Sequence, residues 1–134
     1  MNKKNEQYKL DNKRFFEARR QEEGVCYIPG GIAYKVLASG DGTQSPKAYN
    51  IVTCHYRGST IDGHVFDESY SSGIPAAFRV DELIEGFQMA LERMHVGDHW
   101  EVYIPQQLGY GNLAQKDIPK YSTLIFEIQL EKIY

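Results

Sequence analysis

A carboxylate placed among aromatic side chains is the feature of this sequence with the clearest chemical potential. Asp67 directly follows Phe66, and Tyr56 lies eleven residues earlier, on the other side of Asp62-Gly63. Both central residues of a type I′ turn need a positive φ, which Asp and Gly tolerate, so we predict a type I′ β-hairpin here. Its two arms then bring a phenol, a phenyl ring and a carboxylate together. Such a carboxylate can transfer protons or orient a neighbouring hydroxyl.

Other familiar catalytic patterns are absent from the sequence. There is no phosphate-binding loop, no paired-histidine metal motif and no Gly-x-Ser-x-Gly nucleophile turn. His55 is expected on the strand face opposite Cys54, so it cannot activate that thiol. Cys26 and Cys54 each fall in a predicted strand, where a free thiol behaves as a small buried apolar group. We therefore expect no metal, no cofactor and no nucleophilic catalysis.

Length and charge restrict the classes of protein and partner. With 134 residues the chain is expected to form one domain, and its net charge of −3 gives no basic surface for nucleic acid. No window reaches the ~20 apolar residues that a membrane span needs. As written, the N-terminus carries no apolar signal region, which favours a cytoplasmic location. The alternative is a periplasmic or cell-envelope location after removal of a leader.

Residues 1–23 differ from the rest of the chain. They carry a net charge of +2, which leaves −5 on residues 24–134. Tyr8, Phe15 and Phe16 recur at helical spacing among good helix formers, and Gly24 supplies a stop, so we predict a helix over about residues 5–22. One interpretation is that this aromatic stripe packs on the domain. The other is that it forms a surface for self-association or for a partner.

The remaining elements predict an antiparallel sheet and one short helix. Residues 32–37 predict a strand, apolar residues alternate along 50–57, 100–104 and 124–130, and a short strand is expected at 77–80. Asp81 is a good N-cap for an amphipathic helix, in which Gly86 suggests close packing against the backbone. A loop of about sixteen residues follows Pro105, and loops of this length are usually functional. The expected fold is α+β, with about five antiparallel strands and a helix against their apolar face.

A series of short motifs in fixed order then resembles one known family. The motifs are His55-Tyr56-Arg57-Gly58, Asp62-Gly63, Val65-Phe66-Asp67-Glu68-Ser69, Leu83-Ile84-Glu85-Gly86-Phe87, Ile104-Pro105, Gly109-Tyr110-Gly111, Ile118-Pro119 and Thr123-Leu124-Ile125-Phe126-Glu127. In order and spacing they resemble the FKBP-type peptidyl-prolyl cis–trans isomerases. The bacterial branch that includes the macrophage infectivity potentiator proteins is most similar at Pro75-Ala76-Ala77-Phe78, at the strand of Trp100 and at Gly30-Gly31-Ile32-x-Tyr34-Lys35-Val36-Leu37. The resemblance covers about residues 24–134, which would be the isomerase domain, with residues 1–23 as a charged helical extension.

The resemblance implies a half-barrel sheet wrapped around the short helix, with a substrate pocket between them. Catalytic roles would fall to Asp67, Tyr110, Phe66 and Tyr56. Substrate would be bound by Phe78, Leu83, Ile84, Phe87, Ile118 and Phe126. The sequence departs from the family at Phe87, where a Trp is usual on the pocket floor, and the loop after Tyr110 is about one residue shorter.

The implied activity is rotation about the bond before proline, which assists protein folding. An apolar pocket can favour the twisted, less dipolar amide without covalent chemistry. The implied partners are proline-containing polypeptides and macrolide inhibitors of the FK506 and rapamycin type. Two other interpretations stay open: a chaperone module that binds proline or macrolides with little turnover, and an assembly protein that works through the helix of residues 1–23.

Overall fold

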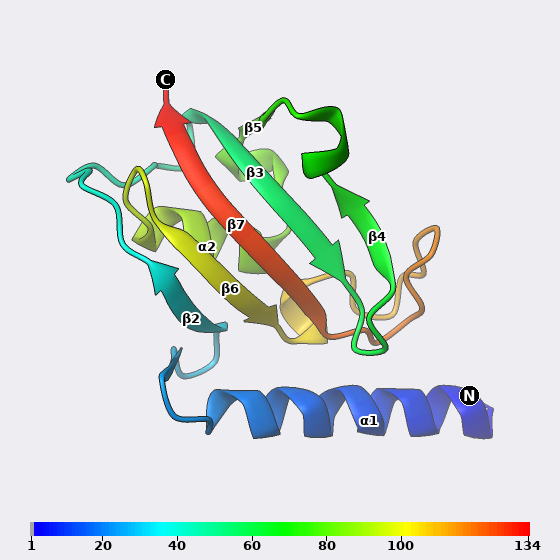
Figure 1. Ribbon diagram of the computed structural model, residues 1–134. Coiled ribbons are helices and arrows are strands. Elements are labelled where there is room, and N and C mark those ends of the chain that lie inside the picture. The colour runs from blue at the N-terminus through cyan, green and yellow to red at the C-terminus, as the bar shows by residue number, and fades with distance from the viewer. Residues whose placement is uncertain (1) are drawn as a thin grey trace.

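A computed structural model, which describes residues 2–134, shows a seven-stranded antiparallel sheet with two helices (Figure 1). The sheet order is β1-β2-β6-β7-β3-β4, and β5 pairs with β3 beside that path. The helices are α1 (Lys3–Arg20) and α2 (Glu85–Arg93), and the strands are β1 (Val25–Tyr27), β2 (Ala33–Ala38), β3 (Ile51–Ser59), β4 (Val65–Glu68), β5 (Ala76–Arg79), β6 (His99–Ile104) and β7 (Leu124–Ile133). Short 3-10 turns occur at Tyr70–Ser72, Val80–Glu82 and Gln106–Leu108.

The strands β3 and β7 form the centre of the sheet. Burial alternates along both, because successive side chains of a strand point to opposite faces. Their register places Tyr56 opposite Ile128 and Gly58 opposite Phe126. Val52, Cys54 and Tyr56 therefore face the main core, which α2 closes from the same side.

The number of strands is larger than the expected five. The seven strands include three short ones: β1, which has three residues, and β4 and β5, which have four residues each. The burial predicted for Cys54 is confirmed, but the same prediction for Cys26 is wrong, because Cys26 is exposed on β1. Since β1 is the first strand in the sheet order, it is an edge strand with only one neighbour, and its side chains are covered less than those of β3.

The predicted start of α2 at Asp81 is also wrong. Asp81 lies in the 3-10 turn Val80–Glu82, where its carboxylate pairs with Arg79 at 2.8 Å instead of capping a helix. The helix begins at Glu85, with Ile84 at the N-cap position. The close packing expected at Gly86 is confirmed, since a Cβ there would collide with the side chain of Ile104 on β6.

The hairpin between β3 and β4 exists, but its turn is not of type I′. Within residues 2–134 the only non-Gly residues with positive φ are Asp117 and Tyr121, so Asp62 does not have the φ that a type I′ turn needs. The Gly63 N–H donates to the Thr60 carbonyl at 3.0 Å, and Gly63 has φ 87°. This is a three-residue loop that ends in a left-handed glycine. The Asp62 carboxylate accepts from the Thr60 hydroxyl, which favours this turn.

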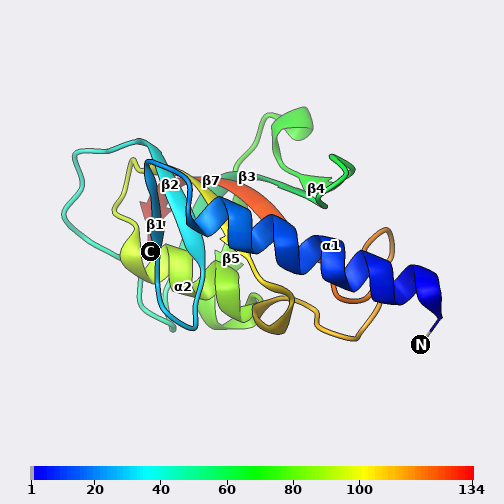
Figure 2. The same ribbon diagram turned by 90° about the horizontal axis from the view of Figure 1, so that it is seen from below.

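Helix α1 packs against one end of the sheet (Figures 1 and 2). Phe16 is buried with Ala33 of β2 and Tyr103 of β6, and Phe15 meets the Tyr103 ring edge-on at 6.5 Å. Tyr103 points to the face opposite Val102 and Ile104, so this small core is separate from the one beneath α2. The interpretation in which the aromatic stripe packs on the domain is confirmed.

The anchor of α1 is a buried asparagine. Asn12 is 1% exposed, and its side chain donates to the Tyr8 carbonyl and accepts from the Thr123 N–H, each at 2.7 Å. The Tyr8 hydroxyl adds a bond of 2.7 Å to Ser122. These contacts join the helix to the end of the long loop before β7. Neither α1 nor α2, which are the α-helices of residues 2–134, is both long and apolar enough to cross a membrane.

Candidate functional site

Five aromatic rings from five elements of the fold meet on the α2 side of the sheet. We name them the aromatic cluster; its members are Tyr56 (β3), Phe66 (β4), Phe78 (β5), Phe87 (α2) and Phe126 (β7). The ring centroids of Phe87 and Phe126 are 5.0 Å apart, and those of Phe66 and Phe126 are 5.6 Å apart. Most of the pairs are edge-to-face, the arrangement that ring quadrupoles favour.

The cluster has a buried base and partly exposed sides. Phe87, Phe126 and Tyr56 are 3%, 6% and 8% exposed. The side chains packed against them are only half-buried: Phe66, Phe78, Leu83, Ile84 and Tyr110. A ligand that covers these half-buried side chains would remove further apolar surface from water, which is the condition for binding an apolar group such as a prolyl ring.

Gly58 makes the close approach of two rings possible. A Cβ at this position would lie 2.6 Å from Phe126 and 2.7 Å from Phe66. The rings therefore occupy the space above the β3 backbone that any other residue would fill. The sequence motif contained this glycine, but its role was not predicted, because the clash depends on two side chains from other strands.

Asp67 and Tyr56 are joined as the hairpin pattern predicted. The Tyr56 hydroxyl donates to the Asp67 carboxylate at 2.6 Å. The β3–β4 register pairs Asp67 with Gly58, which puts Tyr56 on the adjacent diagonal. Burial raises the pKa of Tyr56 well above its ordinary value of 10.0, and the hydrogen bond and charge of Asp67 raise it further. The phenol thus stays protonated, and the exposed carboxylate remains at the edge of the cluster.

Ser69 is a supporting residue that our reasoning from sequence did not identify. It is buried, its hydroxyl accepts from the Tyr56 N–H at 2.8 Å, and its own N–H donates to the Tyr56 carbonyl at 2.9 Å. These bonds fix the backbone on both sides of the Tyr56 side chain. The sequence feature that could have identified Ser69 is its position two residues after Asp67, where the pairing of β3 and β4 ends.

Tyr110 lies in the long loop and presents a free hydroxyl. Its side chain packs against the main core, and within residues 2–134 its hydroxyl forms no hydrogen bond with the protein. Burial raises the pKa of Tyr110, and the negative charge of Asp67 raises it further. The loop is shaped by two backbone bonds, from Gly111 to Gln106 at 2.9 Å and from Tyr121 to Gly111 at 2.7 Å. A neutral phenol is therefore available as a donor beside the aromatic cluster.

The segment before α2 supplies a second free donor. Ile84 is the N-cap residue, and its carbonyl accepts the N–H groups of Phe87 and Gln88. Its own N–H has no acceptor in the part of the chain that the structure describes. The Gln88 side chain donates to the Leu83 carbonyl at 2.6 Å, which fixes the backbone that carries this donor.

Ile118, in contrast, is 5% exposed and belongs to the core cluster together with Phe126 and Leu124. The other predicted apolar and aromatic residues, namely Tyr56, Phe66, Phe78, Leu83, Ile84, Phe87, Tyr110 and Phe126, belong to the same main core or pack against it. Asp67 joins them through its hydrogen bond to Tyr56. Across residues 2–134, no group of three His, Cys, Asp or Glu side chains is arranged to hold a metal ion.

The site thus combines an antiparallel sheet, one short helix packed on it and an aromatic cluster contributed by both. A family model described as FKBP-type peptidyl-prolyl cis-trans isomerase matches residues 42–131. The chain belongs to this family.

The similar proteins include members of the Mip and FkpA group. The peptidyl-prolyl cis-trans isomerase Mip of Coxiella burnetii is 42% identical over 120 residues, which cover 89% of this chain and 52% of that protein. The crystal structure of FkpA from Escherichia coli has a TM-score of 0.88 and 35% identity, over 97% of this chain and 62% of that one. A peptidyl-prolyl cis-trans isomerase structure from Pseudomonas syringae has a TM-score of 0.88 and 30% identity, over 99% and 98% of the two chains.

The chain spans little more than half the length of curated relatives such as Mip of Coxiella burnetii. The predicted resemblance to the macrophage infectivity potentiator branch is confirmed by these relatives, since a Mip protein is among them.

Proposed function

We propose that this chain accelerates cis–trans isomerisation of peptide bonds that precede proline. The observation that carries the proposal is the buried base of the aromatic cluster, bordered by the Asp67 carboxylate and by two free donors, the Ile84 N–H and the Tyr110 hydroxyl. Family membership supports the same activity.

The chemistry follows from the electronic structure of the amide. Resonance gives the peptide bond a rotation barrier of ~18–20 kcal/mol, and X-Pro bonds interconvert over tens to hundreds of seconds. At the twisted transition state the resonance is lost, and the amide is less dipolar than in either planar form. An apolar environment disfavours the planar, charge-separated ground state, and each ~1.4 kcal/mol of difference changes the rate about tenfold.

Each side chain has a proposed role in this step. Phe66, Phe87 and Phe126 hold the prolyl ring on the aromatic cluster. The Ile84 N–H and the Tyr110 hydroxyl donate to substrate carbonyls. Asp67 orients the Tyr56 hydroxyl and places negative potential near the rotating carbonyl, as the bond of 2.6 Å between them allows.

A protease-coupled assay on an X-Pro peptide tests the proposal. We expect acceleration by the wild-type chain, and a loss of most of it in Asp67→Val and in Phe66→Tyr. Asp41→Val is the matched control, because Asp41 is an exposed aspartate outside the aromatic cluster. If the folded wild-type protein gives no acceleration, the enzymatic function is wrong.

A second candidate function is a binding module that docks proline-containing or macrolide-type ligands with little turnover. Phe87 favours it, since this residue forms the most buried part of the cluster, at 3% exposed, and a phenyl ring there fills less space than an indole. Calorimetric titration with rapamycin, beside the isomerase assay on the same sample, separates the two functions. Binding without acceleration supports the module, and acceleration supports the enzyme.

The roles of the two parts of the chain are also proposals. Residues 24–134 form the isomerase domain and residues 1–23 a helical extension. Self-association through this extension would have to use the part of α1 that faces away from the sheet, where Leu10 is 38% exposed. Sedimentation velocity of the chain and of a Leu10→Glu variant tests it, because association through this face would be lost in the variant.

For the compartment we propose the cell envelope, the alternative to the cytoplasmic prediction. The support is that one relative, 38% identical over 130 residues, is named outer membrane protein MIP of Legionella longbeachae. Cell fractionation with an antibody against residues 24–134 tests it, and recovery of the protein only in the cytoplasm would reject it.

A further inference from the structure

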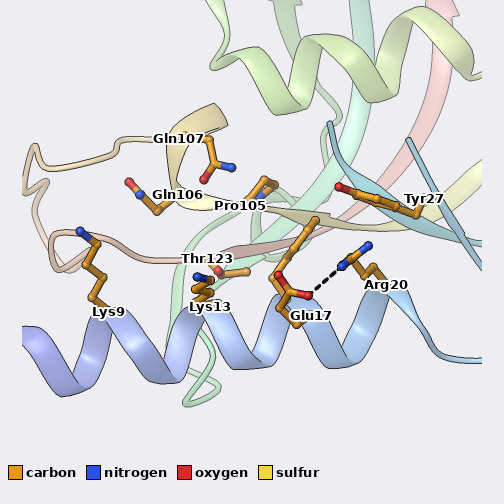
Figure 3. A pocket seen from close by; sticks show the side chains of 10 residues that line it. Lys9, Lys13, Glu17, Arg20, Tyr27, Pro105, Gln106, Gln107 and Thr123 are labelled. Atoms are coloured by element: carbon orange, nitrogen blue, oxygen red, sulfur yellow. Dashed lines mark hydrogen bonds and ion pairs between the residues drawn. The ribbon is translucent and has the colours of Figure 1, made fainter. Parts of the chain in front are cut away.

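A groove lined by several charged side chains lies between α1 and the end of the sheet. It holds about 440 Å³ of free space (Figure 3). We name it the α1 groove; it is lined by Lys9, Lys13, Phe16, Glu17, Arg20, Tyr27, Pro105, Gln106, Gln107 and Thr123. None of the residues of the aromatic cluster lines it. We propose that the α1 groove binds an extended acidic peptide segment, and that it does so independently of proline isomerisation.

The helical wall supplies the positive charge. Lys9, Lys13 and Glu17 recur at four-residue intervals and Arg20 follows three residues later, which places all four on one face of α1. Arg20 is paired with Glu17 at 2.8 Å. Among residues 2–134, neither Lys9 nor Lys13 forms an ion pair. Lys9, whose ammonium lies over the Tyr121 ring at 4.5 Å, and Lys13 therefore leave a net positive charge at one end of the groove, and the neutral Glu17–Arg20 pair lies at the other.

The opposite wall supplies amide groups and an apolar base. Gln106 and Gln107 extend from the turn after Pro105, across from the helix. Within the described chain their side chains form no hydrogen bond, so they can donate to and accept from a peptide backbone. Phe16 at 8% exposed and the buried Pro105 form the base between the walls. The groove thus offers apolar contact beside unsatisfied polar groups.

The dimensions and charges select the class of ligand. From Lys9 to Arg20 the helix rises about 16 Å, which an extended peptide of about five residues would span. Acidic side chains match Lys9 and Lys13, and an apolar side chain matches Phe16 and Pro105. A nucleic acid strand fits less well, since Glu17 lies in the groove and the whole chain has a net charge of −3.

Backbone NMR titration with proline-free pentapeptides tests the proposal. The probe is acetyl-Glu-Glu-Leu-Val-Thr-amide, and the control probe is acetyl-Lys-Lys-Leu-Val-Thr-amide. We expect the acidic peptide to shift the amide signals of residues 9–20 and of Gln106 and Gln107, and the basic peptide to leave them unchanged. Because neither probe contains proline, the result does not depend on the isomerase activity.

Charge-reversal variants provide the matched comparison. The double variant Lys9→Glu/Lys13→Glu should weaken binding of the acidic peptide about tenfold, since two attractions become repulsions. Lys3→Glu/Lys4→Glu changes the charge of the same helix equally but lies outside the groove, and it should retain the affinity within about twofold. Both variants should isomerise a short X-Pro peptide at the wild-type rate.

Four outcomes would overturn the proposal. They are an absence of shifts in the α1 groove at saturating acidic peptide, an equal loss of affinity in the two double variants, tighter binding of an oligothymidylate than of the peptide, and groove shifts that depend only on protein concentration. The third would assign the groove to nucleic acid, and the fourth to a second copy of this chain.

Discussion

At the scale of single residues, the hydrogen bond between Tyr56 and Asp67 offers the most direct test of the proposed mechanism. Asp67 is solvent-exposed, so removing its partner leaves a hydrated carboxylate and costs little folding stability. Tyr56, in contrast, lies among Phe78, Phe87 and Phe126, and its orientation affects the whole aromatic cluster.

We expect Tyr56→Phe and Asp67→Asn each to lower kcat/KM about five- to thirtyfold, which corresponds to about 1–2 kcal/mol for a hydrogen bond to a charged group. If the two residues act as one unit, the double variant should lose no more than the stronger single variant. The double-mutant cycle is measured with the protease-coupled assay. Additive losses would show that Asp67 acts on the substrate without Tyr56.

The thiol of Cys54 gives a pH-dependent contribution to stability. Burial, and to a lesser degree the charge of Glu131, raises the pKa of Cys54 from 9.0 to about 12. The folded state therefore holds this proton more tightly than the unfolded state. The stabilisation is fully present below pH 9 and is lost as the pH rises towards 12.

Relative to Cys54→Ala, the wild-type free energy of unfolding should thus fall between pH 9 and pH 12, measured by urea denaturation at several pH values. Val52→Ala is the control, because Val52 is a buried neighbour on β3 without a titratable group, and it should give a constant difference across the same range. A constant difference for Cys54→Ala as well would mean that its thiol ionises equally in both states.

At the scale of elements, α2 contains a glycine at a position where helix propensity alone would favour another residue. Gly86 faces Ile104 of β6 without room for a methyl group. Gly86→Ala should destabilise the protein by about 1–3 kcal/mol through overpacking, although helix propensity alone predicts a gain of about 1 kcal/mol. In an Ile104→Ala background the same substitution should be neutral or stabilising, because the space is then open. Urea denaturation of the four proteins gives both values, and a gain in the wild-type background would contradict the packing argument.

The attachment of α1 to the rest of the fold depends on the buried hydrogen bonds of a single residue, Asn12. Thr123 is 2% exposed, so its N–H cannot form a hydrogen bond with water when its acceptor is removed. Asn12→Ala should therefore cost about 1–3 kcal/mol and speed hydrogen exchange at the Thr123 amide. Asn5→Ala makes the same chemical change on the exposed side of the helix and should be near neutral. Equal stability of the two variants would mean that the buried bonds do not hold α1.

The elements that the sequence predicted well are those with a long, regular pattern. The alternation along β3 and β7 and the aromatic stripe of α1 depend on each element's own residues and one buried face. Failures occurred where a short-range contact decided the outcome. Asp62 bonded to Thr60 and changed the turn type, and Asp81 paired with Arg79 instead of capping α2.

The candidate site shows a similar division. No periodicity places Phe78, Phe87 and Tyr110 near one another, because they come from β5, α2 and a loop; only the family motifs predicted that they meet. The roles of Gly58 and Ser69 were not predicted, since each depends on a register between strands that the sequence does not state.

At the scale of the whole molecule, the charge asymmetry of the chain suggests an electrostatic attachment of α1, but the contacts indicate otherwise. Within residues 2–134, the ion pairs that involve α1 are Arg19–Glu22 and Arg20–Glu17, and neither reaches the sheet. The helix is held by Phe16, by the bonds of Asn12, and by cations over rings such as Lys9 over Tyr121 at 4.5 Å. Its attachment should therefore depend little on salt.

These contacts predict that α1 unfolds together with the sheet rather than as a separate extension. Trp100, the single tryptophan, is 5% exposed on β6 and reports on the main core by fluorescence. Far-UV circular dichroism at ~222 nm reports mainly on the helices, of which α1 is the longer. In a two-state transition the two signals give coincident urea curves, and we expect this at both low and high salt. An earlier circular-dichroism transition would show that α1 detaches first. If high salt alone separated the curves, the charge asymmetry, and not Phe16 and Asn12, would hold the helix in place.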